Sequence, residues 1–248
     1  MAPNASVKVT NMAGDPMVQL DASTHDYVSN LKQQVIKELM LDPFTAVNLF
    51  HDGCLLPHTA TLAAAGIEPG DVTMAGVLSE HFILDDFKKG EGVVLEGDGV
   101  VRNSTANGNP CAPGSCRVIL GKCPIPLGRH CFRVRLVRGD FYYIGVAEEG
   151  VNLNTWLGAK EHGWSYYLKD NRSGSRLGPG YKDFGPRLKT GDTVTFCYDT
   201  VAGTVDIGQN NGELKPALTG LAGKDLFLAL GMGPNDVTLK LESAWQEQ

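Results

Sequence analysis

The sequence predicts an α+β domain followed by an all-β domain, and three observations carry this prediction. With 248 residues, the chain exceeds the commonest single-domain size of roughly 100–150 residues. Its 30 glycines and 13 prolines indicate many turns, which favours β-rich architecture. The spacing of apolar residues also changes along the chain, from a mixed strand and helix pattern to short strands alone. The apolar fraction of 42% is sufficient for a core in each domain.

The mixed pattern occupies residues 6–78. Alternating apolar residues predict two strands, over 7–11 and 17–20, joined by a turn at Gly14-Asp15-Pro16. A helix is expected next, because apolar residues recur at helical spacing, at Val28, Leu31, Val35 and Leu39. Further strands are expected over 47–50, 54–56 and 72–77, so the order is two strands, one helix and further strands.

That order, the helix start Val28-Ser29-Asn30-Leu31-Lys32 and the segment Leu49 to Leu56 resemble a ubiquitin-like domain, which has a β-grasp fold. The resemblance covers nearly all of residues 6–78. Ubiquitin and its close relatives end in a free diglycine tail that is conjugated to other proteins. Here the last strand runs on into Leu78-Ser79-Glu80-His81, so conjugation is not expected.

The same resemblance implies an apolar recognition patch on the sheet. The matching positions in this chain are Met12, Leu49, Thr73 and Ala75. The implied partner is ubiquitin-pathway machinery, such as a proteasome or ubiquitin-ligase component. The alternative is that these residues only complete a small fold, since single exposed apolar residues need no special explanation.

Residues 79–92 are expected to connect the two domains. The run Lys88-Lys89-Gly90-Glu91-Gly92 is polar and rich in glycine, as flexible linkers are. Phe82, Leu84 and Phe87 are too apolar for a free tether. The first half of the connector is therefore expected to pack on a domain.

From residue 93 to residue 242 the sequence predicts an antiparallel sandwich of short strands. Its most regular part lies between Gly163 and Gly212, where Val194, Phe196 and Tyr198 are spaced by two and can form one apolar strand face. Strands are separated by turns rich in Gly, Asn and Pro, and no amphipathic helix of useful length occurs here.

An ordered series of motifs in this region resembles a SPRY domain, covering about residues 93–242. The series consists of Tyr143-Ile144-Gly145-Val146-Ala147, Trp156-Leu157-Gly158, Gly163-Trp164-Ser165-Tyr166, Leu188-Lys189-Thr190-Gly191-Asp192 and Asn210-Asn211-Gly212. The resemblance implies a bent sandwich of two antiparallel sheets without catalytic activity. It also implies a protein or peptide ligand held by loops on one edge.

The positions of this chain that match the ligand-binding loops of SPRY domains are Asn103, Thr105, Asn107, Leu153, Trp156, Met232 and Asn235. Aromatic and polar loop residues on a rigid scaffold are typical of protein recognition. Trp156 has an alternative assignment to the core, which is the assignment favoured for Trp164.

Other chemistry is not favoured. The net charge of −6 argues against nucleic acid, and no apolar stretch approaches the roughly 20 residues that span a membrane. The cysteines Cys111, Cys116, Cys123 and Cys131 lack the paired spacing of zinc sites, so no metal is expected, nor any cofactor or catalytic residue. All six cysteines are expected to be reduced thiols in a cytoplasmic protein, with the nucleus as a further location.

The densest basic run is formed by Arg129, Arg133, Arg135 and Arg138, and it predicts a solvated strand face or an acidic contact. The function that these patterns favour is a non-enzymatic adaptor. Two alternatives stay open: an intracellular carbohydrate-binding sandwich, and a structural subunit of a larger assembly.

Overall fold

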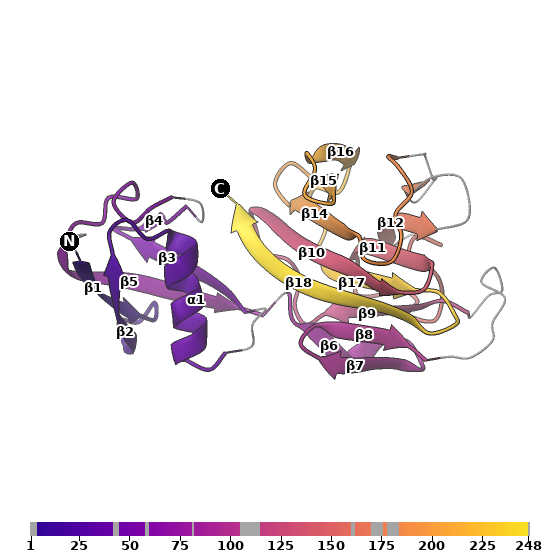
Figure 1. The fold of residues 1–248 in the computed structure, drawn as a ribbon, viewed down its shortest axis with the longest axis horizontal. Coiled ribbons are helices and arrows are strands. Elements are labelled where there is room, and N and C mark those ends of the chain that lie inside the picture. The colour runs from indigo at the N-terminus through magenta and orange to yellow at the C-terminus, as the bar shows by residue number, and fades with distance from the viewer. Residues whose placement is uncertain are drawn as a thin grey trace. The chain divides into compact units, whose positions relative to one another are not determined.

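The computed structural model describes residues 4–41, 45–57, 60–80, 82–104, 115–159, 162–169, 176–177 and 184–247. The chain divides into two compact units, one of Met1–Glu80 with Trp245–Gln248 and one of His81–Ala244, and each is described by itself (Figure 1). No helix in the described residues is long and apolar enough to span a bilayer.

In the described residues, the first unit consists of one helix and a five-stranded sheet. The helix is α1 (Val28–Glu38), and the strands are β1 (Asn4–Thr10), β2 (Pro16–Ser23), β3 (Ala46–His51), β4 (Cys54–Leu55) and β5 (Gly70–Ser79). Their order in the sheet is β2-β1-β5-β3-β4, and β1 and β5 run parallel. The predicted order of strands and helix is therefore confirmed.

Burial of one helix face against one sheet face holds the first unit together. Val28, Leu31 and Val35 of α1 are fully buried in the same cluster as Val7 and Val9 of β1. Their helical and strand spacings place them on single faces, as the sequence predicts. The helix start has no side-chain cap.

The second unit is a sandwich of two sheets with antiparallel strand pairing. The described strands of one sheet, in the order β16-β15-β14-β10-β18-β8-β7, are β7 (Val93–Gly97), β8 (Val100–Asn103), β10 (Arg129–Arg138), β14 (Thr193–Asp199), β15 (Thr204–Gln209), β16 (Lys215–Leu218) and β18 (Val237–Glu247). The described strands of the other, in the order β13-β12-β11-β17-β9-β6, are β6 (Leu84–Lys89), β9 (Arg117–Gly121), β11 (Phe141–Ala147), β12 (Gly163–Lys169), β13 (Arg176–Leu177) and β17 (Phe227–Met232). The predicted antiparallel sandwich is confirmed.

Aromatic rings fill part of the core of the second unit. The rings of Phe132 and Phe196 stack with centroids 5.0 Å apart, and Phe82 packs against Phe132 at 6.0 Å. Phe132 and Phe196 lie directly opposite each other in β10 and β14, so strand register brings the two rings together.

Strand β6 and the residues before it confirm that the first half of the expected connector, residues 79–92, packs on a domain, and they correct its second half, which is a paired strand and not a free linker. Strand β6 pairs with β9 at the edge of its sheet, and both Phe82 and Leu84 are buried. Removing these apolar side chains from water is favourable, and a flexible tether would leave them exposed. Most of the predicted connector therefore belongs to the second unit.

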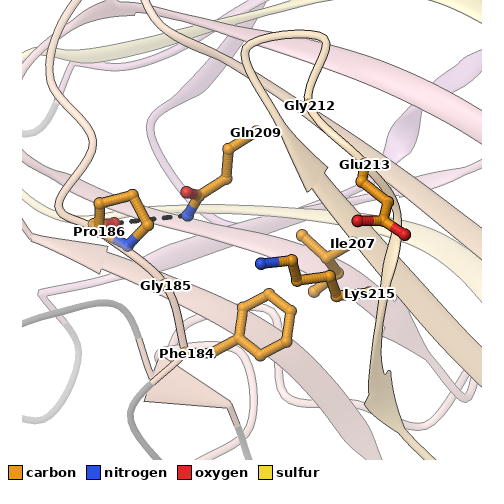
Figure 2. Close-up of a pocket in the computed structure, with 8 residues that line it drawn as sticks. All are labelled: Phe184, Gly185, Pro186, Ile207, Gln209, Gly212, Glu213 and Lys215. Atoms are coloured by element: carbon orange, nitrogen blue, oxygen red, sulfur yellow. Dashed lines mark hydrogen bonds between the residues drawn. The ribbon is translucent and has the colours of Figure 1, made fainter.

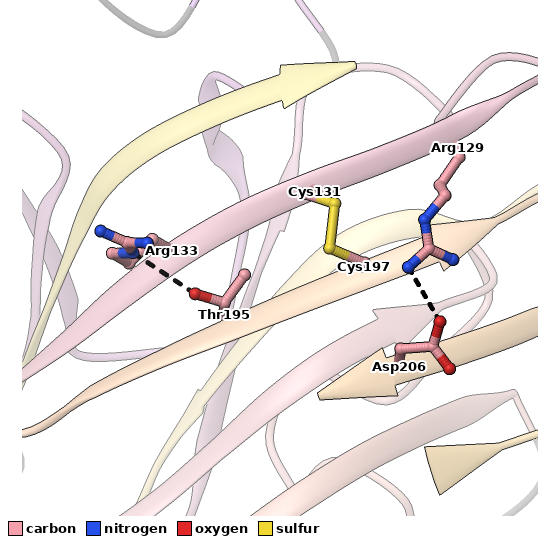
Figure 3. The surroundings of a disulfide bond; sticks show 6 residues. All are labelled: Arg129, Cys131, Arg133, Thr195, Cys197 and Asp206. Atoms are coloured by element: carbon pink, nitrogen blue, oxygen red, sulfur yellow. Dashed lines mark hydrogen bonds and ion pairs between the residues drawn. A yellow bond between two sulfur atoms is a disulfide. The ribbon is translucent and has the colours of Figure 1, made fainter. Parts of the chain in front are cut away.

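A disulfide joins Cys131 and Cys197, which contradicts the expectation of six reduced thiols (Figure 3). The two residues are direct partners in β10 and β14, with Cα atoms 4.0 Å apart. Close Cα atoms are typical of antiparallel pairs that lack mutual backbone hydrogen bonds. A pairing across 66 residues of sequence separation depends on register, which cysteine spacing does not reveal.

The basic run on β10 meets polar partners inside the same unit. Arg129 pairs with Asp206 at 2.8 Å, and Arg133 Nε donates to Thr195 Oγ1 (Figure 3). Arg135 pairs with Glu242, and Arg138 pairs with Asp236. Acidic residues of the same unit thus balance the charges of Arg129, Arg135 and Arg138, so these three side chains need no acidic partner from outside.

Candidate functional site

Hydrogen bonds bring the end of β8 and the turn before β18 together at one edge of the second unit. Asn103 Nδ2 donates to the carbonyl oxygen of Gly233 at 2.8 Å. The amide of Gly233 in turn donates to the carbonyl oxygen of Phe141 at 2.8 Å. Two of the three predicted binding segments therefore adjoin each other and the start of β11.

The third predicted segment, residues 148–159 between β11 and β12, is fastened to the same side. The carbonyl oxygen of Leu153 accepts a hydrogen bond from the Val118 amide at 2.9 Å. The side chain of Asn154 accepts one from the Glu91 amide at 2.8 Å.

The turn Gly90-Glu91-Gly92 completes the connection, since Ser104 Oγ donates to the Gly92 carbonyl oxygen at 3.0 Å. We call residues 103–104, 148–159 and 233–236 together the loop edge.

A row of aromatic rings lies beneath the loop edge. The Trp156 ring stacks on Tyr143, with centroids 6.3 Å apart, and Tyr143 stacks on Tyr167 at 4.8 Å. Phe141 continues the row, 5.3 Å from Tyr167. Alternation along β11 puts Phe141 and Tyr143 on one face, and the register of β11 and β12 puts Tyr167 opposite Tyr143.

Two glycines permit this close packing. A Cβ atom on Gly233 would lie 2.4 Å from the Phe141 Cβ, and one on Gly90 would lie 2.3 Å from the Leu153 carbonyl oxygen. No other residue fits these positions without a backbone shift. The contacts fix where the loops sit on the sheet.

Glu148 holds the start of the loop that carries Leu153 and Trp156. Its carboxylate contacts His162 Nδ1 and lies 2.7 Å from the Lys224 ammonium, which in turn lies over the Trp164 ring at 4.9 Å. The hydrogen bond with His162, then the one with Lys224, holds the pKa of Glu148 below its ordinary value. The loop start therefore carries an ionised, multiply bonded carboxylate near neutral pH.

The structure separates the predicted SPRY-type positions into exposed and buried ones. Leu153 and Trp156 are partly exposed, and Asn235 is exposed with a left-handed backbone at φ 72°. Asn103 and Met232 have no exposed surface. Thr105 and Asn107 lie outside the described residues.

Two of these placements are corrections. Met232 pairs with Tyr142 in the strand register, and both side chains are buried in the core, so Met232 cannot contact a partner. Asn103 cannot contact a partner either, because its side chain is buried and its amide donates to the Gly233 carbonyl oxygen.

Phe141, Tyr143 and Tyr167 belong to the site although the sequence patterns do not predict it. The signal was present in the spacing by two of Phe141 and Tyr143. That spacing alone does not predict a row of rings, because Tyr167 joins Phe141 and Tyr143 only through the pairing of β11 with β12.

The predicted patch of the first unit is partly corrected as well. Met12 and Thr73 are exposed and Ala75 is partly exposed, but Leu49 is fully buried against the helix side of the sheet. In the strand register Phe50, one residue further, lies directly opposite Ala75. A shift of one residue along a strand moves the side chain to the other face, so Phe50 takes the place assigned to Leu49.

In the part of the chain that the structure describes, no group of three or more His, Cys, Asp and Glu side chains is placed to hold a metal ion. Cys131 is in addition unable to ligate a metal, because its sulfur is bonded to Cys197. The chemistry that the loop edge offers is contact through aromatic, aliphatic and amide groups.

Comparison with known proteins agrees with this geometry. The family model described as SPRY domain matches residues 129–242. Ran-binding protein 10 of Danio rerio is 32% identical over 114 residues, and Ran-binding protein 9 of Mus musculus is 31% identical over 114 residues. Each match covers 44% of this chain but only 18% and 17%, respectively, of those proteins, so the chain spans a small part of their length.

Solved structures show the same fold. The SPRY domain of human HERC1 aligns with a TM-score of 0.53 and 18% identity, over 64% of this chain and 96% of that one. The PSpry domain of TRIM65 aligns with a TM-score of 0.51 and 14% identity, over 64% and 89%. Together with the two antiparallel sheets and the loop edge, these matches identify residues 129–242 as a SPRY domain, which is a protein-interaction domain.

Proposed function

We propose that this chain is a non-enzymatic adaptor whose SPRY domain holds a peptide or protein segment at the loop edge. The observation that carries the proposal is the partly exposed Trp156 ring, which stacks on the buried Tyr143 ring between fastened loops. A few side chains carry most of the binding energy in protein interfaces, and Trp and Tyr are enriched among them.

The contacts of the loop edge favour a ligand of mixed character. Trp156 and Leu153 offer apolar surface, while the exposed Asn235 offers an amide that can donate and accept hydrogen bonds. Since the loops are already tied to β8, β9 and β11, binding orders few groups and loses little conformational entropy. An extended segment with one apolar anchor fits this arrangement.

The proposal extends to the first unit as a ubiquitin-like domain that docks to ubiquitin-pathway machinery in the cytoplasm or nucleus. Its support is the mixed sheet β2-β1-β5-β3-β4 with a single described helix, the arrangement of a β-grasp. The outer sheet face presents Thr73, Ala75 and Phe50, and Met12 lies exposed at the first turn.

The loop-edge proposal is tested by affinity capture with the full chain and its Trp156→Ala variant. We expect a protein that is retained by the wild type and lost with the variant, and that binds in purified form. Leu127→Ser is the matched control, because Leu127 is 80% exposed and lies outside the loop edge. Equal binding by wild type and Trp156→Ala would remove the loop edge from consideration.

The docking proposal needs a separate experiment. Full-length chain is titrated with purified ubiquitin-receptor domains of proteasome and ligase subunits, using Phe50→Ser as the test variant. Met40→Ser serves as the control, since Met40 is 91% exposed and lies beyond the end of α1. Absence of any receptor binding by the wild type removes the docking role and leaves the SPRY result unaffected.

A further inference from the structure

The Cys131–Cys197 disulfide lies on the outer face of its sheet and not in the core of the second unit. Side chains alternate along β10, and the ring of Phe132, which stacks in the core, lies on the face opposite to Cys131. Cys131 therefore shares its face with Arg129 and Arg133. Figure 3 shows the bond between these two arginines.

Two polar contacts cover the bond from outside. Arg129 reaches across β14 to β15, where its Nη2 lies 2.8 Å from Asp206 Oδ2, and Asp206 is the direct strand partner of Cys197. On the other side of the bond, Arg133 Nε donates to Thr195 Oγ1 at 3.3 Å. Both bonded cysteines have no exposed surface, whereas both arginines are partly exposed. We call these two contacts the arginine cover.

The arginine cover opens more readily than the strands beneath it. The side chains of Arg129 and Asp206 keep 22% and 21% of their surface exposed. An ion pair in such contact with water suppresses open arrangements by less than about tenfold. Separating β10 from β14 breaks backbone pairing and core packing, and such openings are rarer by on the order of a thousandfold or more. A small thiol therefore reaches the sulfur atoms by displacing side chains, without separation of the strands.

The bond crosses one particular junction of its sheet. In the described order β16-β15-β14-β10-β18-β8-β7, the pairing of β14 with β10 joins three strands to the other four (Figure 1). Cys131 and Cys197 are direct partners in this pairing. We call residues 193–218, which contain β14, β15 and β16, the three-strand set. A cross-link at this place limits how far the three-strand set can move away from β10.

The three-strand set also forms part of the wall of a pocket. The pocket has a volume of about 310 Å³, and Ile207, Gln209, Glu213 and Lys215 line it from β15, β16 and the turn between them (Figure 2). Phe184, which lies outside the set, contributes to the remaining wall. The shape of the pocket therefore depends on the position of the three-strand set.

We propose that the Cys131–Cys197 bond is a redox switch, which small thiols of the glutathione class open through the arginine cover and whose reduction loosens the three-strand set. The thiolate of the reductant attacks one cysteine sulfur, the S–S bond breaks, and the other cysteine leaves as a thiolate. A second reductant thiolate attacks the resulting mixed disulfide and releases the second cysteine.

The products are two protein thiols, which take up the protons that the two reductant thiols lost, and one disulfide of the oxidised reductant. The reverse exchange with that disulfide restores the protein bond. Disulfides of cytosolic proteins are usually transient, catalytic or redox-sensing, which agrees with the location proposed above. The switch goes beyond the proposed binding function and does not depend on it, because the loop edge contains no residue of the three-strand set.

The first test measures how fast the bond of the full oxidised chain is reduced, by alkylation and mass spectrometry of the peptides that contain Cys131 and Cys197. Glutathione is used for the wild type, and uncharged 2-mercaptoethanol for comparing variants. We expect Arg129→Ala to raise the rate constant about three- to tenfold, because it removes part of the cover. Asp206→Asn should raise it less, since the Arg129 side chain remains. Arg138→Ala, at the far end of β10 and 69% exposed, is the matched control and should react like the wild type.

Urea separates the two routes to the sulfur atoms. Attack through the arginine cover exposes little new surface, so the rate constant should stay nearly constant at urea concentrations below the unfolding transition. A rate constant that rises with urea as steeply as the unfolding equilibrium, or equal rates for wild type and Arg129→Ala, would overturn the proposal. A retained thermal transition verifies that each variant is folded.

The second test compares amide hydrogen exchange in the oxidised and the reduced full chain. Reduction should speed exchange about tenfold or more in β14 and β15, including Ile207 and Gln209 beside the pocket, because the cross-link no longer limits their opening. Strand β8, which β18 separates from β10, is the internal control and should exchange equally in both states. Unchanged exchange throughout the three-strand set would show that the bond does not control it.

Discussion

The Trp156 ring stacks on the Tyr143 ring, with centroids 6.3 Å apart and planes inclined by 27°. Tyr143 is buried and Trp156 is partly exposed, so one ring supports the other. A loop side chain is thereby held in one orientation by the sheet beneath it. This relationship gives the loop edge a fixed apolar contact point.

Substitutions at these two rings should have different effects. Trp156→Ala is expected to weaken ligand binding about 10- to 30-fold, as at interface hot spots. Tyr143→Ala is expected to lower the free energy of unfolding by about 3–5 kcal/mol, because a buried aromatic ring is removed. Urea unfolding followed by far-ultraviolet circular dichroism, combined with calorimetric binding, separates the two. A loss of several kcal/mol in Trp156→Ala would place this ring in the core.

The glycine at the turn before β18 should resist substitution. Gly233→Ala is expected to lower the free energy of unfolding of the second unit by about 1–3 kcal/mol, since its Cβ would lie 2.4 Å from the Phe141 Cβ. Gly150→Ala is the matched control, because nothing lies within 4 Å of its added Cβ, and it should change stability by less than about 0.5 kcal/mol. Equal urea unfolding midpoints for Gly233→Ala and Gly150→Ala would contradict the close approach of Gly233 to Phe141.

The disulfide should stabilise the second unit. Joining residues separated by 66 positions restricts the unfolded chain, and the corresponding stabilisation is up to about 4 kcal/mol. The Cys131→Ala, Cys197→Ala double variant should therefore unfold at lower urea concentration than the oxidised protein. Intact mass after alkylation measures the bond directly, with two additional alkylated thiols expected only after reduction. The same number of alkylated thiols before and after reduction would show that the bond is absent.

Lys32 should make the first unit more stable at high pH. This side chain is buried, and burial lowers its pKa from 10.5 to about 8. Between these values the unfolded chain holds a proton that the folded chain has released, so stability rises as pH rises and is lowest below pH 8. Lys32→Met should therefore increase the free energy of unfolding at pH 7, by on the order of 1–3 kcal/mol.

The measurement for Lys32 is urea unfolding followed by NMR signals of β1 and β5 amides at several pH values. Lys37→Met is the matched control on the same helix, because it carries the same change outside the buried set. If Lys32→Met raised the free energy of unfolding by the same amount at pH 7 and near pH 10.5, proton binding at Lys32 would not be the cause.

Local patterns sufficed to predict most of the elements. The helical spacing of Val28, Leu31 and Val35 and the alternation of Val194, Phe196 and Tyr198 lead directly to buried faces in α1 and β14. Such periodicities depend only on neighbouring residues. The SPRY-type motif series likewise placed the loops that the structure brings together.

The features that the sequence did not predict depend on contacts between residues far apart in the chain. The Cys131–Cys197 bond requires the register of β10 with β14, and the aromatic row requires that of β11 with β12. Leu49 was assigned to the outer face, but pairing of β3 with β5 turns it inward and turns Phe50 outward. An error of one residue in register reverses the face of a strand side chain, and no local pattern corrects it.

The central claim, that a peptide or protein segment binds at the loop edge, is tested most directly by NMR titration of the full chain with its captured ligand. The account predicts the largest amide shift changes at residues 103–104, 153–156 and 233–236, with saturation at one site. Largest changes in the β15–β16 hairpin or in the first unit, with the Trp156 signals unmoved, would contradict it.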